Sequence, residues 1–324
     1  MKSPSPSGKL RIGHLSTFYH TAILLMAEGR LGKDIGLDVE WRLFGTGPAM
    51  VAAFEKGELD LAYIGLPPAI IGISRGVRIV CIAGGHVEGT VISGNKGSVG
   101  FPEFQDLGAI LDQFRGRNIG VPGNGSIHDV ILAECLERYR LREEVEVVHY
   151  QWSDEVTEAI VKGNLAAAVG TPALAIAIQH YADGRILYPP SLLWPNNPSY
   201  GIIADRNYLR NEGEGVEKFL VRHEDATSLI RDRPGLAAEI IAGYVGFIDK
   251  EFVMDTLRVS PKYCAQLTED YIFSTMEFVR VLKRLGYVDR EIPSEEIFDT
   301  TMIHALHPSK DHYGDGIADS RMEP

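Results

Sequence analysis

Short apolar runs and amphipathic segments alternate along the first part of the chain. The apolar runs, rich in Val, Ile and Leu, predict strands at 10–15, 37–44, 59–65 and 77–85. The segments between them carry apolar side chains at helical spacing and predict helices at 20–31, 49–57 and 67–76. Strands that alternate with helices of about ten residues are typical of a mainly parallel sheet.

The same order of elements occurs a second time. Strands are predicted at 117–121, 145–152, 165–170 and 185–188, with helices at 126–139, 154–163 and 172–181. The strongest local match lies between residues 56–70 and 162–176, which both begin with Lys-Gly-x-Leu and both continue to a Gly-x-Pro. We therefore predict an α/β fold of two similar lobes with mainly parallel sheets.

Two segments rich in turn-forming residues separate the repeated units, at about 86–116 and 189–201. From residue 205 onward the pattern is mainly helical. We expect the chain to divide into a tether at 1–8, a first lobe at 9–88 plus 202–300, a second lobe at 89–201 and a tail at 301–324. The tail has little apolar periodicity, which predicts a surface arm or a disordered segment.

Composition narrows the class of partner. The net charge of −12 argues against nucleic acid, because binding phosphates requires a basic face. No apolar run approaches the roughly 18 residues of a membrane-spanning helix. The opening MKSPSPSGK has no apolar core, so the protein is either cytoplasmic or numbered from behind a removed export signal.

The isolated cysteines Cys81, Cys135 and Cys264 predict no disulfide framework and no metal site, and the first two fit core positions.

Ligands of open parallel sheets gather at the carboxyl ends of the strands, and these ends select particular turns. The turns lie at 14–20, 44–48, 64–68, 84–89, 122–129, 151–155 and 170–173. Thr46, Ser126, Ser153 and Thr171 suit helix N-caps, and such helix ends present free N–H groups to a cleft. Ordinary capping explains each of these residues singly, but their convergence favours a binding site.

Within these turns we select the ligand-contacting residues. The first-lobe wall is predicted to contain Thr17, Phe18, His20, Gly45, Thr46 and Gly65. The second-lobe wall is predicted to contain Gly125, Ser126, His128 and Thr171, with His86 and Trp194 near the hinge. Small-molecule clefts are typically apolar and aromatic with a few directed polar groups, which is the mixture found here.

Several motifs carry a family resemblance. The chain has Gly36-Leu37-Asp38-Val39-Glu40, then Gly45-Thr46-Gly47, then Gly57-Glu58-Leu59-Asp60 before a helix that starts with proline. In this it resembles the substrate-binding proteins of ABC importers for sulfonates, nitrate and thiamine-pyrimidine precursors, over roughly 9–300. The resemblance implies the type II periplasmic-binding-protein fold, with two crossovers between the lobes, hinge closure on the ligand and delivery to an ABC permease. We expect a periplasmic or extracytoplasmic monomer that needs no cofactor and catalyses no reaction. The Ser/Pro stretch before the first strand would fit a trimmed or lipid-anchored mature terminus.

Enzymes on the same scaffold remain the alternative. The resemblance to a sulfinate desulfinase is weakened because the loop after the first strand, 14–20, contains no cysteine. The pyrimidine synthase of thiamine biosynthesis carries a cysteine-rich motif that this chain lacks, although His20 could match a histidine of its first loop. A cytoplasmic enzyme of this type, or one of the menaquinone pathway, stays open.

The chemistry of the turns indicates a class of ligand. They contain no Arg or Lys, which disfavours nitrate or sulfate-like ions because such anions are usually held by charged side chains. Two alternatives stay open: a basic side chain such as Arg75 or Lys96 reaches the cleft from elsewhere, or helix N–H groups alone hold a singly charged carboxylate. Aromatic side chains and histidines favour a flat aromatic or heteroaromatic molecule. His14, His20, His86 and His128 could also suggest a metal, but they lack a ligand spacing, and no metal site is predicted.

Overall fold

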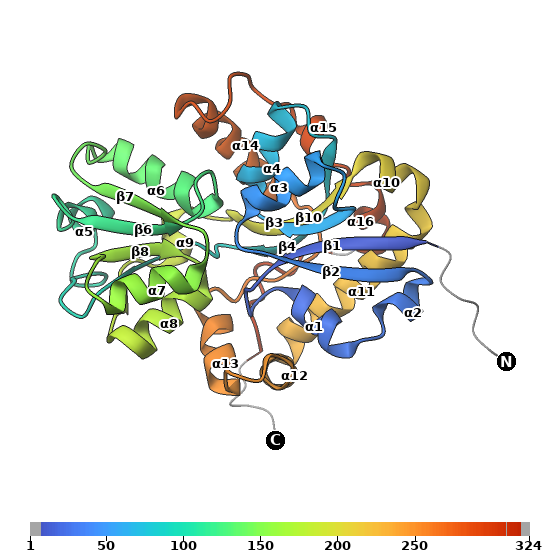
Figure 1. The fold of residues 1–324 in the computed structure, drawn as a ribbon, viewed down its shortest axis with the longest axis horizontal. Coiled ribbons are helices and arrows are strands. Elements are labelled where there is room, and N and C mark those ends of the chain that lie inside the picture. The colour runs from blue at the N-terminus through green and yellow to red at the C-terminus, as the bar shows by residue number, and fades with distance from the viewer. Residues whose placement is uncertain (1–7, 309, 319–324) are drawn as a thin grey trace.

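The structure is a computed structural model that describes residues 8–308 and 310–318. Two α/β lobes lie side by side, each built on a five-stranded sheet covered by helices (Figure 1). The strand orders are β2-β1-β3-β10-β4 and β7-β6-β8-β5-β9. Each position in one sheet therefore has a counterpart in the other, which confirms the two similar lobes predicted from the repeat.

The first sheet is covered on both faces. Its strands are β1 (Lys9–Leu15), β2 (Asp38–Phe44), β3 (Leu61–Ile64), β4 (Ile79–Val87) and β10 (Pro198–Asp205). Every residue of β3 and β4 is buried, which is why both read as continuous apolar runs. The edge strand β2 instead carries Asp38, Glu40 and Arg42 among its apolar residues, and charged residues protect an edge from further pairing. The helices of this lobe are α1 (Thr21–Glu28), α2 (Leu31–Ile35), α3 (Gly47–Glu55), α4 (Leu66–Ser74), α10 (Arg206–Asn211) and α11 (Gly213–Asp232).

The second lobe repeats this plan with strands that are mostly shorter. Its strands are β5 (Val91–Gly94), β6 (Asn118–Pro122), β7 (Glu146–Tyr150), β8 (Ala167–Gly170) and β9 (Arg185–Ile186). Its helices are α5 (Leu107–Asp112), α6 (Ile127–Arg138), α7 (Ser153–Val161), α8 (Pro172–Ala182) and α9 (Pro190–Leu193). The short strand β5 lies in a segment whose turn-forming residues predicted only a link.

The chain crosses between the sheets twice before the C-terminal helices. One crossing, 88–90, leads from β4 into β5, and the other, 187–197, leads from β9 into β10. Both β5 and β10 run antiparallel to their neighbours, while the remaining strands of each sheet share one direction. β10 begins at Pro198 because its first residues already pair with Val87 and His86, so the return to the first sheet starts before residue 202. We still propose a first lobe of 9–88 plus 202–300 and a second lobe of 89–201. The boundary between 201 and 202 moves back to Pro198, where β10 begins.

The C-terminal helices contact both lobes. They are α12 (Pro234–Val245), α13 (Lys250–Val259), α14 (Glu269–Arg284), α15 (Ser294–Ile297) and α16 (Thr301–Leu306). α13 packs against α8 of the second lobe, and α14 packs between α4 and α6. Arg284 at the end of α14 pairs with the buried Glu134 of α6, and the Tyr287 hydroxyl donates to Asp129 at 2.7 Å. α14 and α13 lie on opposite sides of the space between the lobes (Figure 1).

The predicted tail at 301–324 is partly wrong. Its described part, 301–308 and 310–318, forms α16 and then a segment that places Tyr313 against the first lobe. The Tyr313 side chain is buried, and its hydroxyl donates to the Gln266 carbonyl at 3.1 Å. A single aromatic anchor carries no periodicity, so the pattern did not reveal this contact. Residues 309 and 319–324, like 1–7 of the predicted tether, lie outside the described residues.

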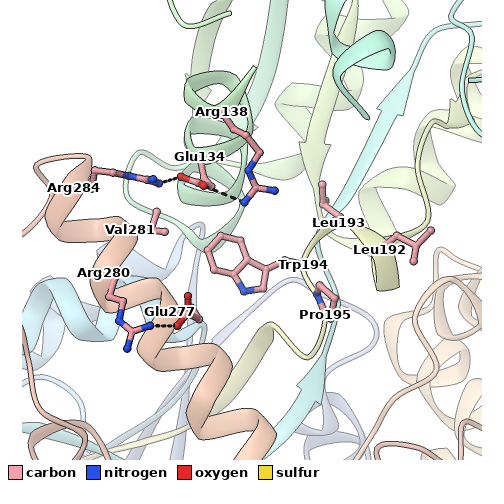
Figure 2. Close-up of a pocket in the computed structure, with 10 residues that line it drawn as sticks. All are labelled: Glu134, Arg138, Leu192, Leu193, Trp194, Pro195, Glu277, Arg280, Val281 and Arg284. Atoms are coloured by element: carbon pink, nitrogen blue, oxygen red, sulfur yellow. Dashed lines mark hydrogen bonds and ion pairs between the residues drawn. The ribbon is translucent and has the colours of Figure 1, made fainter. Parts of the chain in front are cut away.

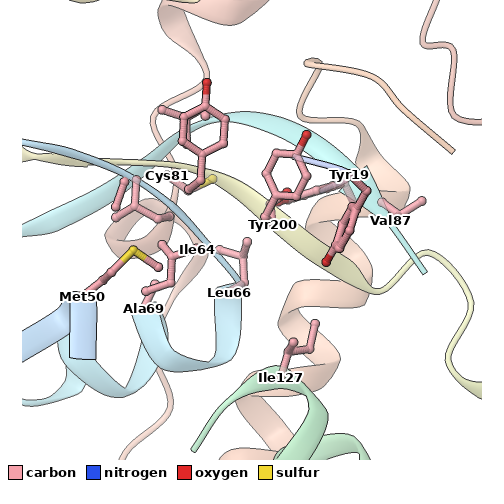
Figure 3. Packing of buried hydrophobic residues seen from close by; sticks show 14 of the residues in the cluster. Tyr19, Met50, Ile64, Leu66, Ala69, Cys81, Val87, Ile127 and Tyr200 are labelled. Atoms are coloured by element: carbon pink, nitrogen blue, oxygen red, sulfur yellow. The ribbon is translucent and has the colours of Figure 1, made fainter. Parts of the chain in front are cut away.

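The largest apolar core joins the first sheet to the face of α6 (Figure 3). Tyr19, Tyr200 and Cys81 are buried in it, and Ile127 of the second lobe packs into the same cluster. All three cysteines are free and buried, which confirms the core positions predicted for Cys81 and Cys135. Burial raises the pKa of each of these two thiols to about 12.

Two glycine substitutions test the tight packing of β4 on β10. A methyl group at Gly85 would overlap the Tyr200 ring, whereas one at Gly243, inside α12, would meet no heavy atom within 4 Å. Gly85→Ala should lower the free energy of unfolding by about 1–3 kcal/mol through overpacking. Gly243→Ala should raise it by about 0.5–1 kcal/mol, because alanine is the better helix former. Chemical denaturation of both variants checks the opposite signs; equal stability of the two would contradict this packing.

Candidate functional site

A small polar cavity, called here the inner cavity, lies where the two lobes meet. Its volume is about 40 Å³. The lining comes from the turns that follow strands in both sheets, as the rule of carboxyl strand ends predicts. Of the residues selected from the sequence, the structure brings together Thr17, His20, Gly45, Thr46, Gly65, Ser126, His128 and Thr171.

The first loop contributes polar atoms that have no partner. His20 is the N-cap residue of α1 and is 1% exposed, and Thr17 is 4% exposed. Among the described residues, neither ring nitrogen of His20 nor the Thr17 hydroxyl has a hydrogen-bond partner. The His20 ring lies 4.1 Å from the Tyr200 ring and 4.6 Å from the Tyr19 ring, centroid to centroid. Buried polar groups without partners are costly, so these atoms are suited to bind something that enters the cavity.

Helix N-termini surround the same space. Thr46, Ser126 and Thr171 each accept a hydrogen bond from a backbone N–H in the first turn of α3, α6 and α8, which confirms the predicted caps. Ser153 was predicted as a cap and is not one, because α7 begins one residue earlier, with Trp152 as its N-cap residue. There the Glu155 carboxylate accepts the Trp152 N–H at 2.9 Å.

The electrostatic character of the inner cavity is neutral. None of the described residues that line it is Arg, Lys, Asp or Glu. Burial lowers the pKa of His128 to about 4. Burial also holds the pKa of His20 well below 6.5, with a smaller contribution from His86, His14 and His128 nearby. Both imidazoles are therefore uncharged at neutral pH, and each offers one donor and one acceptor.

A polar network supports the second-lobe wall from behind. His128 Nδ1 lies 3.0 Å from the Thr90 hydroxyl on the first crossing. The buried Asp129 accepts from the Gly125 N–H at 2.8 Å, His149 Nε2 at 2.7 Å and the Tyr287 hydroxyl at 2.7 Å. Burial alone would raise the pKa of Asp129, but these hydrogen bonds hold that pKa below its ordinary value. Asp129 thus fixes the loop that carries Ser126 and His128.

Four of the predicted residues lie outside the inner cavity. Gly125 lies in its supporting loop with φ of 76°, where a side chain would be strained. His86 was predicted in a turn, but β4 continues to Val87, so its ring is buried against Tyr19 and Tyr263 and its Nε2 bonds the Ser260 carbonyl at 2.7 Å.

Trp194 lies near the crossings but faces away from the inner cavity. It stacks on Phe278 with centroids 4.0 Å apart and donates to the Ser274 hydroxyl at 3.2 Å. Figure 2 shows it in a separate pocket of about 550 Å³ beside Glu134 and Arg138. Packing onto α14, which is distant in sequence, turned this side chain away.

Phe18 lines a second and larger cavity, called here the outer cavity, of about 610 Å³. Its ring lies 6.0 Å from the rings of Phe247 and Phe252, which belong to the α12–α13 region. No local pattern in the sequence places these C-terminal helices beside the first loop. Sequence reasoning also missed Tyr19, Ser16 and Ser199 in the inner cavity. Tyr19 and Ser16 could have been found from their position in the turn at 14–20. Ser199 could not, because its place depends on how β10 returns to the first sheet after the second crossing.

The two lobes are in direct contact around the inner cavity. A methyl group at Gly45 would overlap the Gln151 carbonyl oxygen of the other lobe, and one at Gly123 would lie 2.8 Å from Thr46 Cγ2. The described residues include no group of three His, Cys, Asp or Glu side chains able to hold a metal ion. No helix in the described ranges is long and apolar enough to cross a membrane.

The neutral histidines should make the fold acid-sensitive. Their folded-state pKa lies below the unfolded value of 6.5, so their stabilisation is complete above pH 6.5 and is lost as the pH falls toward 4. For His128 the loss between pH 7 and pH 5 should be on the order of 2 kcal/mol. His128→Gln should flatten the fall in free energy of unfolding, measured by denaturant titration across this range.

His149→Gln is the matched control with the opposite sign. The hydrogen bond to Asp129 raises the pKa of His149, so this group contributes stability below pH 6.5 and loses it as the pH rises. Removing this imidazole should make the free energy of unfolding fall more steeply as the pH is lowered. Identical pH profiles for both variants and the parent would contradict the assignment.

Comparison with known proteins agrees with the fold. The model of the NMT1-like family matches residues 3–244. A Brucella abortus (strain 2308) protein, named Putative binding protein BAB2_1146, is 26% identical over 239 residues, which cover 73% of this chain and 71% of that one.

Solved structures resemble the whole chain. The alkanesulfonate-binding protein SsuA from Xanthomonas axonopodis pv. citri, bound to MOPS, superposes with a TM-score of 0.74 at 16% identity, covering 92% of this chain and 99% of that one. The periplasmic nitrate-binding protein NrtA from Synechocystis PCC 6803 gives a TM-score of 0.74 at 12% identity, covering 98% and 93%. The type II binding-protein fold expected from the sequence is thereby confirmed. The sequence motifs had indicated that the chain resembles the substrate-binding proteins of ABC importers. Because the family model spans most of the sequence, the chain belongs to the NMT1-like family.

Proposed function

We propose that this protein captures a small molecule in the inner cavity and delivers it to an ABC permease in the membrane, acting as a monomer outside the cytoplasm. The observation that carries the proposal is the burial of the Thr17 hydroxyl and both His20 nitrogens between two lobes without partners. A ligand that bonds these atoms stabilises the closed arrangement selectively, because they can be solvated by water when the lobes separate.

The chemistry of the lining supports an aromatic or heteroaromatic ligand with a polar edge. The neutral imidazole of His20, whose two nitrogens have no partner among the described residues, matches a ligand edge that both donates and accepts hydrogen bonds. Nδ1 of the neutral His128 is bonded to Thr90, which leaves Nε2 for a ligand. The N-termini of α3, α6 and α8 favour acceptor atoms or a single negative charge. A doubly charged anion is disfavoured, since the described lining contains no Arg or Lys. The volume of about 40 Å³ admits only the polar edge while the lobes stay this close.

Binding without turnover fits the groups available. The hydroxyls of Thr46, Ser126 and Thr171 accept helix N–H groups as caps, and among the described residues none of the three is bonded to a histidine, as activation of a nucleophile by a neighbouring base would require. The curated relative is also named as a binding protein rather than an enzyme. Steady consumption of a bound compound by the purified protein would instead favour the enzymatic alternative.

Thr17→Val tests the inner cavity because it removes only an unpartnered hydroxyl. The unliganded variant should be as stable as the parent or slightly more so, since a buried group without a partner is lost. Affinity should fall by roughly tenfold or more, on the order of 1–3 kcal/mol for a lost buried hydrogen bond. Thermal-shift titration with nitrogen heterocycles, aromatic carboxylates, sulfonates and nitrate identifies the ligand, and calorimetry measures the change.

The matched control is Thr275→Val, which removes a buried hydroxyl bonded within α14. It should cost stability and leave affinity unchanged. The proposal fails if no compound of the screen raises the melting temperature of the parent protein, or if Thr17→Val binds the best compound as tightly as the parent does.

Gly45→Ala tests whether binding depends on closure. The added methyl group would overlap the Gln151 carbonyl oxygen, so the lobes should remain apart although each lobe folds normally. Small-angle scattering with saturating ligand should show a larger radius of gyration than the parent complex, and affinity should fall at least about tenfold, about 1.4 kcal/mol. Gly243→Ala, remote from the interface, serves as the control. Parent-like compaction and affinity in Gly45→Ala would show that this close contact is dispensable.

A further inference from the structure

The outer cavity has three apolar walls that come from distant parts of the chain. Leu43 at the end of β2 belongs to the first lobe, Val161 at the end of α7 and Tyr181 on α8 belong to the second, and Phe247 lies between α12 and α13. Its volume of about 610 Å³ is within the range of small-molecule sites, roughly 300–1,000 Å³.

These apolar side chains are left in solvent. Leu43 is 55% exposed, Val161 53%, Tyr181 65% and Phe247 78%. Single exposed apolar residues are ordinary, but several gathered around one hollow mark a binding surface. The Phe18 ring, which packs edge-on against Phe247 at 6.0 Å, forms the inner end of this surface.

The outer cavity adjoins the inner cavity. Ser16, Thr17, Ser153 and Thr171 line both. The Thr17 hydroxyl, buried and without a partner among the described residues, therefore stands at the junction. A single molecule can place a polar group against Thr17 and His20 and extend its remainder along Phe18.

We propose that the outer cavity binds the apolar body of an amphiphilic ligand whose polar head occupies the inner cavity. This inference rests on the function proposed above and narrows its ligand class. The inner cavity, at about 40 Å³, is too small for an aromatic ring with substituents, whereas the outer cavity has room for a ring and an alkyl chain.

Charged residues at the rim of the outer cavity limit which groups the ligand can carry at its far end. Asp154 and Glu158 of α7 line the outer cavity, and none of the described residues that line it is Arg or Lys. Lys162 pairs with Glu158 outside this lining, so Asp154 is the rim carboxylate that would repel a second negative group at the distal end. The body of the ligand is therefore uncharged or cationic.

The test uses matched pairs of probes that differ only in chain length. Benzamide, benzoate, benzenesulfonate and pyridine heads are each titrated calorimetrically as the para-methyl and the para-hexyl compound. Because each buried CH₂ adds roughly 0.8 kcal/mol, affinity should rise about threefold to fourfold per added carbon until the cavity is filled. Phe247→Ser and Val161→Ser should each bring the hexyl-to-methyl affinity ratio down at least about fivefold.

Phe273→Ser is the control. Phe273 lies on α14, is 66% exposed, which is comparable to Phe247, and lines neither cavity. It should leave the ratio unchanged. Equal affinity of methyl and hexyl members for every head that binds would overturn this inference and leave the proposed function intact. Failure of all heads, short and long, would overturn the proposed function itself.

Two further outcomes separate the ligand from other occupants. If hexyl compounds bind equally well to the parent and to Thr17→Val, the outer cavity acts alone and the single-ligand assignment is wrong. If Phe247→Ser leaves every affinity unchanged but abolishes uptake in permease vesicles, the apolar surface binds the permease, and the assignment to ligand is likewise wrong.

Discussion

The two crossings between the lobes are tied to each other by Glu88, and the geometry of the whole cleft depends on this contact. Glu88 takes a left-handed conformation with φ of 63°. Its N–H donates to the Asn197 carbonyl at 2.8 Å, and its carboxylate accepts from the Asn196 N–H at 3.0 Å and from Lys262 at 2.9 Å. A buried carboxylate requires such partners. The crossings therefore act as one joint, and motion of the lobes must occur around it rather than by independent bending of each strand.

The joint also communicates with the inner cavity. Thr90 follows Glu88 on the first crossing and bonds His128, while Ser199 lies just beyond the second crossing and lines the same cavity. The C-terminal side adds a second restraint, because Tyr287 bonds Asp129 directly behind His128. These hydrogen bonds are formed while the lobes are closed. A ligand that stabilises the closed arrangement would therefore add its own bonds to this network, and the free energy of closure would contain both contributions.

Periodicity and residue type predict the strands and helices of the two lobes, but not the contacts that distant segments make with them. The strands and helices of both units and the caps at Thr46, Ser126 and Thr171 follow from local pattern, since each depends on neighbours within a few residues. The binding-protein fold was expected instead from the resemblance of the sequence motifs to a known family. Eight predicted residues line one cavity because strand ends in a parallel sheet converge by topology. Whether any of them touches a ligand remains a prediction.

Errors arose where distant segments decide the outcome. His86 lies in a strand instead of a turn because β10 extends its pairing, and Trp194 turns outward because α14 offers Phe278 as a stacking partner. The outer cavity depends on Phe247, which sits about 230 residues after the first loop and carries no local signal of its role.

Neutrality of the inner cavity and exposure of the outer apolar walls have a common physical cause. A cavity closed by two lobes strips water from whatever it encloses, so any fixed charge there would need a fixed counterion in every state. Neutral imidazoles and helix ends avoid that requirement, since both can exchange their ligand bonds for bonds to water when the lobes part. A weakly polar head bound this way contributes limited affinity. In the proposed arrangement, apolar contact in the adjoining cavity supplies the remainder, because Leu43 and Phe247 are exposed to water when that cavity is empty and would be covered when a ligand binds. The roles proposed for the two cavities would thus reconcile firm binding with release.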